Sequence, residues 1–184
     1  IMPGDFIPLS EETGIINDIG RWLLNSACET IKHWSQQGLP DVTLAVNISA
    51  RELMQADFPE YVIEALERHQ VPGERLELEI TENVLMRDME QAISKLKRLS
   101  ALGVRIAVDD FGTGYSSLSY LQQLPLNTLK IDRSFVSEIR SRKDNNTIIF
   151  AIVSMAKGLN LNLVAEGVES EAQLEFLKRI DCPT

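Results

Sequence analysis

Five short segments of the chain alternate apolar and polar side chains, and this alternation constrains the fold more than any other feature. The segments lie at residues 43–48, 76–81, 104–109, 128–131 and 162–166. Helical patterns separate them, which indicates βα units with parallel strands. Strands of an open parallel sheet are covered on both faces and usually read as continuous apolar runs. One apolar and one polar face instead favour a closed β/α barrel whose lumen is polar at its top.

Apolar residues at helical spacing predict the helices that accompany these strands. The expected helices lie near residues 14–37, 59–69, 88–102, 117–124, 145–159 and 170–180. The expected fold class is therefore α/β, a (β/α)8 TIM-type barrel of which about five βα units are visible. Because such a barrel needs eight strands and roughly 250 residues, we expect residues 1–184 to be a partial domain that lacks the first strands and the last strand.

The charge balance limits the partners of such a domain. The chain carries 27 acidic and 18 basic residues, a formal net charge of −9, which disfavours nucleic-acid polymers because their binding needs clustered Lys and Arg. No apolar run reaches the roughly 18 residues of a membrane span, and no signal-peptide pattern opens the chain. Cys28 and Cys182 lie far apart without metal-ligand spacing, which is typical of reduced thiols in a cytoplasmic domain. Whether the parent protein is membrane-associated is left open.

Charged or amide side chains lie where the predicted strands end. These residues are Asn47, Glu79, Asp109 with Asp110, Lys130 and Glu166. Barrels of this class place their active sites at the C-terminal ends of the strands, so we expect these side chains to meet at one rim. Carboxylates gathered so closely either take up protons or bind cations. Oxygen ligands without His or thiolate partners select Mg²⁺, Mn²⁺ or Ca²⁺ over zinc, and the adjacent acids can address two ions about 3.5–4 Å apart.

Each of these residues also has an ordinary structural explanation. Asn47 can cap a strand end, and Asp109-Asp110 can belong to a turn. Lys130 can pair with an acid inside the barrel, and Glu166 can be a solvated surface acid. The functional interpretation is favoured because five separate strands all end in charged or metal-compatible groups.

Two further charged residues share the polar faces of their strands but lie before the strand ends. Glu77 and Arg105 are expected to face the lumen one step below the rim. We therefore expect them to form a structural ion pair and not to bind a ligand.

Six segments resemble the successive motifs of a bacterial family, the EAL domains, in the family's order and at its spacing. They are Pro8–Gly14 (PLSEETG), Val46–Ser49 (VNIS), Glu77–Glu82 (ELEITE), Asp109–Leu118 (DDFGTGYSSL), Leu129–Asp132 (LKID) and Val164–Glu169 (VAEGVE). The resemblance implies a metal-dependent phosphodiesterase that hydrolyses cyclic di-GMP to linear pGpG. Two ions, Mg²⁺ or Mn²⁺, would activate the attacking water.

Carried over residue by residue, the resemblance implies the ligands of both ions. Asn47, Glu79 and Asp109 would bind one ion. Asp110 and Glu166 would bind mainly the second ion, with Asp109 shared between the two.

The resemblance also implies catalytic roles. Lys130 would hold or polarise the attacking water, or stabilise the charge that develops on the phosphate. Glu166 would take part through its metal ion, and Glu169 is a further catalytic candidate three residues later.

The resemblance also implies a role for the loop that follows the two adjacent acids. Glu82 would brace the loop of residues 111–118. In the family this loop links the metal site to a dimer interface, so we expect a homodimer through the loop after Asp110.

Two family elements are expected outside these residues. The Glu-Ala-Leu strand, with a metal-ligand Glu and a substrate-contacting Arg, would precede Ile1, and a Gln-Gly strand would follow Thr184. We expect the parent protein to supply both strands and to carry additional sensory or diguanylate cyclase-type domains.

Two alternative functions stay open from the sequence. The first is a catalytically inactive EAL-type module that binds cyclic di-GMP as a receptor, which depends on the Glu expected before Ile1. The second is another metal-barrel enzyme with Lys130 as a Schiff-base or enolate-forming group. It ranks below the others because neighbouring acids favour the charged form of a lysine.

Overall fold

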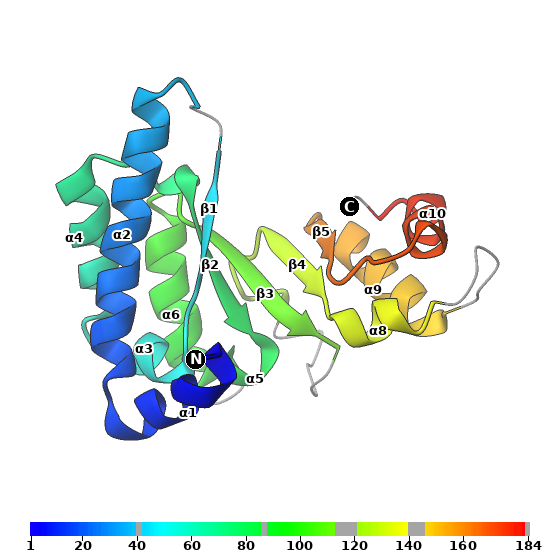
Figure 1. The fold of residues 1–184 in the computed structure, drawn as a ribbon, viewed down its shortest axis with the longest axis horizontal. Coiled ribbons are helices and arrows are strands. Elements are labelled where there is room, and N and C mark those ends of the chain that lie inside the picture. The colour runs from blue at the N-terminus through cyan, green and yellow to red at the C-terminus, as the bar shows by residue number, and fades with distance from the viewer. Residues whose placement is uncertain (40–41, 86–87, 113–120, 140–145, 183–184) are drawn as a thin grey trace. The chain divides into compact units, whose positions relative to one another are not determined.

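The central sheet has five strands in a computed structural model that describes residues 1–39, 42–85, 88–112, 121–139 and 146–182. The strands follow one another in chain order (Figure 1). They are β1 (Leu44–Asn47), β2 (Leu76–Thr81), β3 (Arg105–Phe111), β4 (Thr128–Ile131) and β5 (Asn162–Ala165). The pairs β1–β2, β3–β4 and β4–β5 are parallel. The alternation in the sequence therefore predicted these strands to within two residues at each end, and the α/β fold class is confirmed.

Five helices follow the apolar spacing that predicted them. They are α2 (Ile16–Gln36), α4 (Phe58–His69), α6 (Met89–Ser100), α9 (Thr147–Gly158) and α10 (Glu171–Arg179). The first half of the helix predicted near residues 117–124, residues 117–120, falls outside the described residues. Among the helices that the structure describes, none combines the length and apolar character needed to cross a membrane.

Five elements, four of them short, were not predicted. They are α1 (Pro3–Thr13), α3 (Ala50–Met54), the 3₁₀ turn η1 (Gly73–Arg75), α5 (Glu82–Leu85) and α8 (Arg133–Ser137). Most of them contain only a few residues, so they have too few turns for an apolar period to stand out. Capping side chains fix the starts of two of them, Ser49 that of α3 and Asp132 that of α8.

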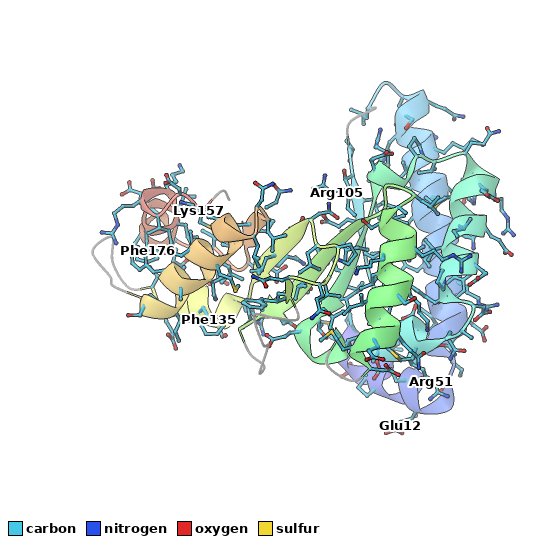
Figure 2. All side chains as sticks on the ribbon, turned by 180° about the vertical axis from the view of Figure 1, so that it is seen from behind. Glu12, Arg51, Arg105, Phe135, Lys157 and Phe176 are labelled. Carbon is cyan, nitrogen blue, oxygen red and sulfur yellow. The ribbon has the colours of Figure 1, made fainter. Side chains whose placement is uncertain are left out.

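The chain divides into two compact units, the first of which comprises Ile1–Ile80 and Val84–Ile106. In this unit α2 packs on α4 and on β1, and α4 packs on α6 (Figure 1). Its core consists of fully buried apolar side chains, among them Leu24, Ile31, Leu53, Phe58, Leu76, Leu78 and Leu96. Arg51 donates a 2.6 Å hydrogen bond to the carbonyl of Glu11, which ties α3 to the end of α1, where Figure 2 labels the adjacent Glu12.

The second unit comprises Thr81–Asn83 and Ala107–Thr184. Helix α9 packs on β4 and β5, and Phe150 of α9 meets Phe176 of α10 edge to face at 5.8 Å between ring centroids; Figure 2 labels Phe176. Strand β4 is buried along its whole length, so Thr128 and Lys130 on its polar face are 4% and 9% exposed. A buried ammonium needs anionic partners, and this requirement identifies β4 as the strand around which a charged site is built.

Side-chain caps fix the backbone just beyond three strands. Ser49 caps α3, and Glu52 accepts from the backbone N–H of Ser49 at 2.9 Å. Asp132 caps α8, and Ser170 caps α10 together with Gln173. In such capping boxes the side chains take up backbone N–H groups that a helix start leaves unpaired. The caps therefore define where the chain turns after each strand end.

The carboxylate of Glu52 lies directly against Gly20 of α2 and leaves no room for a side chain there. A Cβ atom placed on Gly20 would lie 1.6 Å from Glu52 Oε1. Glu52 is 2% exposed, and burial raises the pKa of its carboxyl, against the lowering effect of the hydrogen bonds from Ser49. Glycine is thus required here by close packing and not by backbone conformation.

We predict that Gly20→Ala destabilises the first unit. The new methyl group forces the Glu52 side chain away from Ser49 and disturbs the α3 cap, which should lower the free energy of unfolding by about 1–3 kcal/mol. Gly4→Ala is the matched control because a Cβ at Gly4 meets no atom within 4 Å. Urea denaturation measures both variants, and equal stability of the two would contradict this account of Gly20.

Candidate metal-binding site

Three acids from the two strands that flank β4 come together in the second unit. Asp109 and Asp110 lie near the end of β3, and Glu166 directly follows β5. A carboxylate oxygen from each lies within 4.8 Å of the others, and all three residues are partly buried. Parallel strands bring their C-terminal ends to the same edge of a sheet, which is why acids far apart in the sequence meet here.

Lys130 of β4 lies between two of these acids. Its Nζ atom is 3.2 Å from Asp109 Oδ1 and 2.7 Å from Glu166 Oε1. The Lys130 side chain is 11% exposed and that of Asp109 is 13% exposed, whereas that of Glu166 is 35% exposed. The ammonium therefore offsets part of the negative charge, and three carboxylates still outnumber one cation.

The backbone is irregular where the adjacent acids lie. Asp110 has φ +53°, in the left-handed region that Asp and Asn tolerate better than most non-glycine residues. Its N–H donates to Asp109 Oδ1 at 2.9 Å, and the β3–β4 register shifts between Val108 and Phe111. This irregularity places two consecutive acids at one site although consecutive strand residues normally point to opposite faces.

The charge environment of Asp110 shows how much negative charge is concentrated here. Burial raises the pKa of the Asp110 carboxyl, and the negative charge of Asp109 raises it further. Asp132 shares a hydrogen bond with Asp110 and also accepts from the backbone N–H of Ser134 at 2.9 Å. We assigned Asp132 no role from the sequence, although its place two residues after Lys130 at a strand end was a usable signal.

Glu82 contacts the start of the loop that it was expected to brace. Its carboxylate is almost fully buried and accepts from the N–H of Gly112 at 2.9 Å. Gly112 has φ +98°, and a Cβ there would lie 2.8 Å from the ring of Phe135. Residues 113–118 of the loop, with the expected dimer contact, lie outside the described residues, so its link to dimerisation stays a prediction.

The first unit contains the other two expected ligands as a pair. Asn47 of β1 and Glu79 of β2 are direct partners in the parallel register, and the N–H of Ile48 donates to the Glu79 carbonyl at 2.9 Å. Asn47 is exposed and Glu79 is partly buried. The structure thus brings Asn47 to Glu79. Within the second unit it brings Lys130 to Asp109 and Glu166, which group with Asp110.

Two further sequence expectations concern charged residues beside these sites. Arg105 Nε lies 3.3 Å from Glu77 Oε2, so the expected ion pair is confirmed. Glu169 is exposed, and among the described residues the acidic group consists of Asp109, Asp110 and Glu166 without it. The catalytic role of Glu169 therefore stays a prediction.

Parallel βα units with a metal-compatible acidic group at the C-terminal strand ends define an α/β protein of the barrel type. The family model described as the EAL domain matches residues 1–184, and the chain belongs to this family.

Relatives of known name are similar over almost the whole chain. The bifunctional diguanylate cyclase/cyclic di-GMP phosphodiesterase MucR of Pseudomonas aeruginosa is 48% identical over 182 residues, which cover 99% of this chain and 27% of MucR. The cyclic di-GMP phosphodiesterase NbdA of the same organism is 43% identical over 180 residues, which cover 98% of this chain and 23% of NbdA. The chain thus spans about a quarter of the length of these curated relatives.

A solved structure gives the corresponding likeness in three dimensions. The PaMucR phosphodiesterase in its c-di-GMP complex is 48% identical, with a TM-score of 0.93 over 99% of this chain and 74% of that one. A likeness of this degree supports the barrel-type architecture expected from the alternating strands.

We predict that Lys130→Met destabilises the metal-free protein. The substitution leaves Asp109 and Glu166 without their shared cation, which should cost about 1–3 kcal/mol after allowance for the solvent exposure of Glu166. Lys157→Met is the matched control because Lys157 pairs with Asp181, whose side chain is 85% exposed, and it should change stability by less than about 0.5 kcal/mol. Urea denaturation in EDTA measures the difference, and equal losses in the two variants would refute it.

Proposed function

We propose that the protein containing this chain is a metal-dependent phosphodiesterase that opens cyclic di-GMP to linear pGpG. The observation that carries the proposal is the group of three carboxylates, with oxygens within 4.8 Å of one another, beside the Lys130 ammonium. The names of MucR and NbdA support the substrate and the reaction. The c-di-GMP complex of the MucR phosphodiesterase supports the same ligand.

The donor set fits hard divalent cations. Asp109, Asp110 and Glu166 offer only oxygen ligands, which suit Mg²⁺ and Mn²⁺ and not zinc. Burial and the negative charge of Asp109 raise the pKa of Asp110, so a bound cation would relieve the repulsion between the two carboxylates. We propose two ions, with Asp110 and Glu166 serving mainly one of them and Asp109 shared.

The ligands of the other ion are proposed from the family resemblance. Asn47 and Glu79 would complete that ion's coordination together with Asp109. Support from within the first unit is their direct pairing across β1 and β2. When bound, the ions would supply Lewis-acid polarisation of the phosphate and would lower the pKa of the attacking water.

Lys130 is proposed to act as a fixed cation and hydrogen-bond donor. Two carboxylates within 3.2 Å of its Nζ atom favour the ammonium form. An ammonium can orient a water molecule or stabilise charge that develops on a phosphate oxygen, whereas it cannot attack a carbonyl carbon. This argues against the Schiff-base alternative.

Further parts of the proposal concern the whole protein. The relatives are about four times longer than the matched region, which supports a parent protein with additional sensory or diguanylate cyclase-type domains. We propose that residues 1–184 are a partial EAL domain whose remaining strands the parent supplies, that this domain is cytoplasmic, and that it forms a homodimer through the loop after Asp110. Glu169 is proposed as an additional catalytic residue.

We predict that Asp109→Asn abolishes hydrolysis of cyclic di-GMP in the complete protein that contains this chain. The amide removes the charge that both ions would share, so turnover should fall at least about a thousandfold. Chromatographic detection of linear pGpG measures the rate. The exposed Asp181→Asn variant is the control and should keep wild-type activity. Undiminished turnover by Asp109→Asn would refute the metal assignment.

We further predict that removal of divalent ions stops hydrolysis reversibly. EDTA should abolish pGpG formation, and Mg²⁺ or Mn²⁺ should restore it because oxygen ligands prefer these ions. Hydrolysis that persists in EDTA would exclude the mechanism. A protein that binds cyclic di-GMP with Mg²⁺ or Mn²⁺ present but never forms pGpG would instead be the receptor of the alternative interpretation.

A further inference from the structure

Gln173, a buried residue in the first turn of α10, makes three hydrogen bonds that join two parts of the second unit. Its Oε1 atom accepts from the N–H groups of Glu169 and Ser170 at 2.8 and 2.9 Å. Its Nε2 atom donates to the carbonyl of Val136 in α8 at 3.2 Å. The side chain is 8% exposed, so loss of these partners would leave buried polar groups unpaired.

An amide side chain satisfies all three partners, whereas an ionised carboxylate could not donate to the Val136 carbonyl. Two N–H groups require an acceptor and the Val136 carbonyl requires a donor, which fixes the orientation of the Gln173 amide. The corresponding position of the α3 capping box is Glu52, which accepts from the backbone N–H and the hydroxyl of Ser49. A carboxylate is sufficient at Glu52 because it only accepts hydrogen bonds. Gln173 must also donate to the Val136 carbonyl, which explains why an amide occupies this position in α10.

The loop between β5 and α10 is held against neighbouring elements at both of its ends. The N–H of Glu166 donates to the carbonyl of Ile131 at 3.1 Å. Gly167, with φ +69°, approaches α8 so closely that a Cβ would lie 2.8 Å from Arg133 Cβ. Gln173 fastens the far end of the loop, so the direction in which the chain leaves Glu166 is determined by these contacts.

The helix to which Gln173 attaches also bears on the acidic site. Asp132 precedes helix α8 and caps it, and its carboxyl shares a hydrogen bond with Asp110. The Val136 carbonyl near the end of this helix receives the Gln173 amide. Gln173 therefore connects the loop of Glu166 to the helix whose capping residue contacts Asp110.

We infer that Gln173 is a positioning residue for the metal-binding carboxylates, holding the loop that carries Glu166 in register with α8. The inference rests on the proposed function, because it assumes that Asp109, Asp110 and Glu166 bind divalent ions. Residues that orient metal ligands without touching the ion typically contribute 10–100-fold in metal affinity. Gln173 acts through the backbone, so we expect a loss near the lower end of this range.

The test is Mn²⁺ affinity of the complete protein, measured by electron paramagnetic resonance of free Mn²⁺. Mn²⁺ binding at the proposed site is defined as the fraction of the total Mn²⁺ binding that is lost in the Asp110→Asn variant. Gln173→Leu, which removes all three hydrogen bonds at similar volume, should weaken that binding about tenfold. Gln173→Glu, which keeps both acceptor contacts but loses the donor, should give a smaller loss and provides the test if the Leu variant fails to fold.

The control is Gln91→Leu, because Gln91 occupies the third position of α6 and donates to its cap, Asp88, at 2.7 Å. It should bind Mn²⁺ as the wild type does. Amide hydrogen exchange at Glu169 and Ser170 should accelerate in Gln173→Leu and not in Gln173→Glu.

Wild-type Mn²⁺ affinity in both Gln173 variants, or a loss no greater than in Gln91→Leu, overturns this inference alone. Absence of Mn²⁺ binding by the wild-type protein overturns the proposed function and this inference with it.

Discussion

Like-charge repulsion at the ends of β3 and β5 is the constraint on which the second unit depends. Carboxylate oxygens of three acids lie within 4.8 Å of one another, and such an arrangement is costly unless cations or protons neutralise it. Lys130 supplies one cation from a strand that is buried along its length. The burial of this strand follows from the packing of α9 on β4 and β5. The same packing therefore stabilises the fold and holds the only cation that the structure places between these acids among its described residues.

Side chains hold the backbone immediately after the strands that end in functional groups. In each case a side-chain oxygen accepts from backbone N–H groups within a few residues of the strand end. The pairs are Glu52 with Ser49, Glu82 with Gly112, Asp132 with Ser134, and Gln173 with Glu169 and Ser170. Loops that follow barrel strands carry function on a rigid scaffold. These hydrogen bonds explain how short loops keep the acids in place against their mutual repulsion.

The sequence predicted the strands because a half-polar strand leaves a period of two that a few residues suffice to show. It also predicted the acids at the strand ends and the Glu77–Arg105 ion pair. It did not predict α3 or α8, which contain five residues each and are defined by Ser49 and Asp132 as caps. The role of Asp132 was missed because the short helix that it caps was not predicted, although the residue lies at a strand end two residues after Lys130. The left-handed backbone of Asp110 could not be foreseen, because it results from the register shift between β3 and β4.

The backbone conformation of Asp110 has an evolutionary consequence. At φ +53° the residues accommodated with least strain are Gly, Asn and Asp. Replacement of this acid by Asn or Gly is therefore cheap for the fold, while it discards a charge from the site. Under the proposed function, a lineage could therefore lose a metal ligand in a single step, without first acquiring compensating changes in its core.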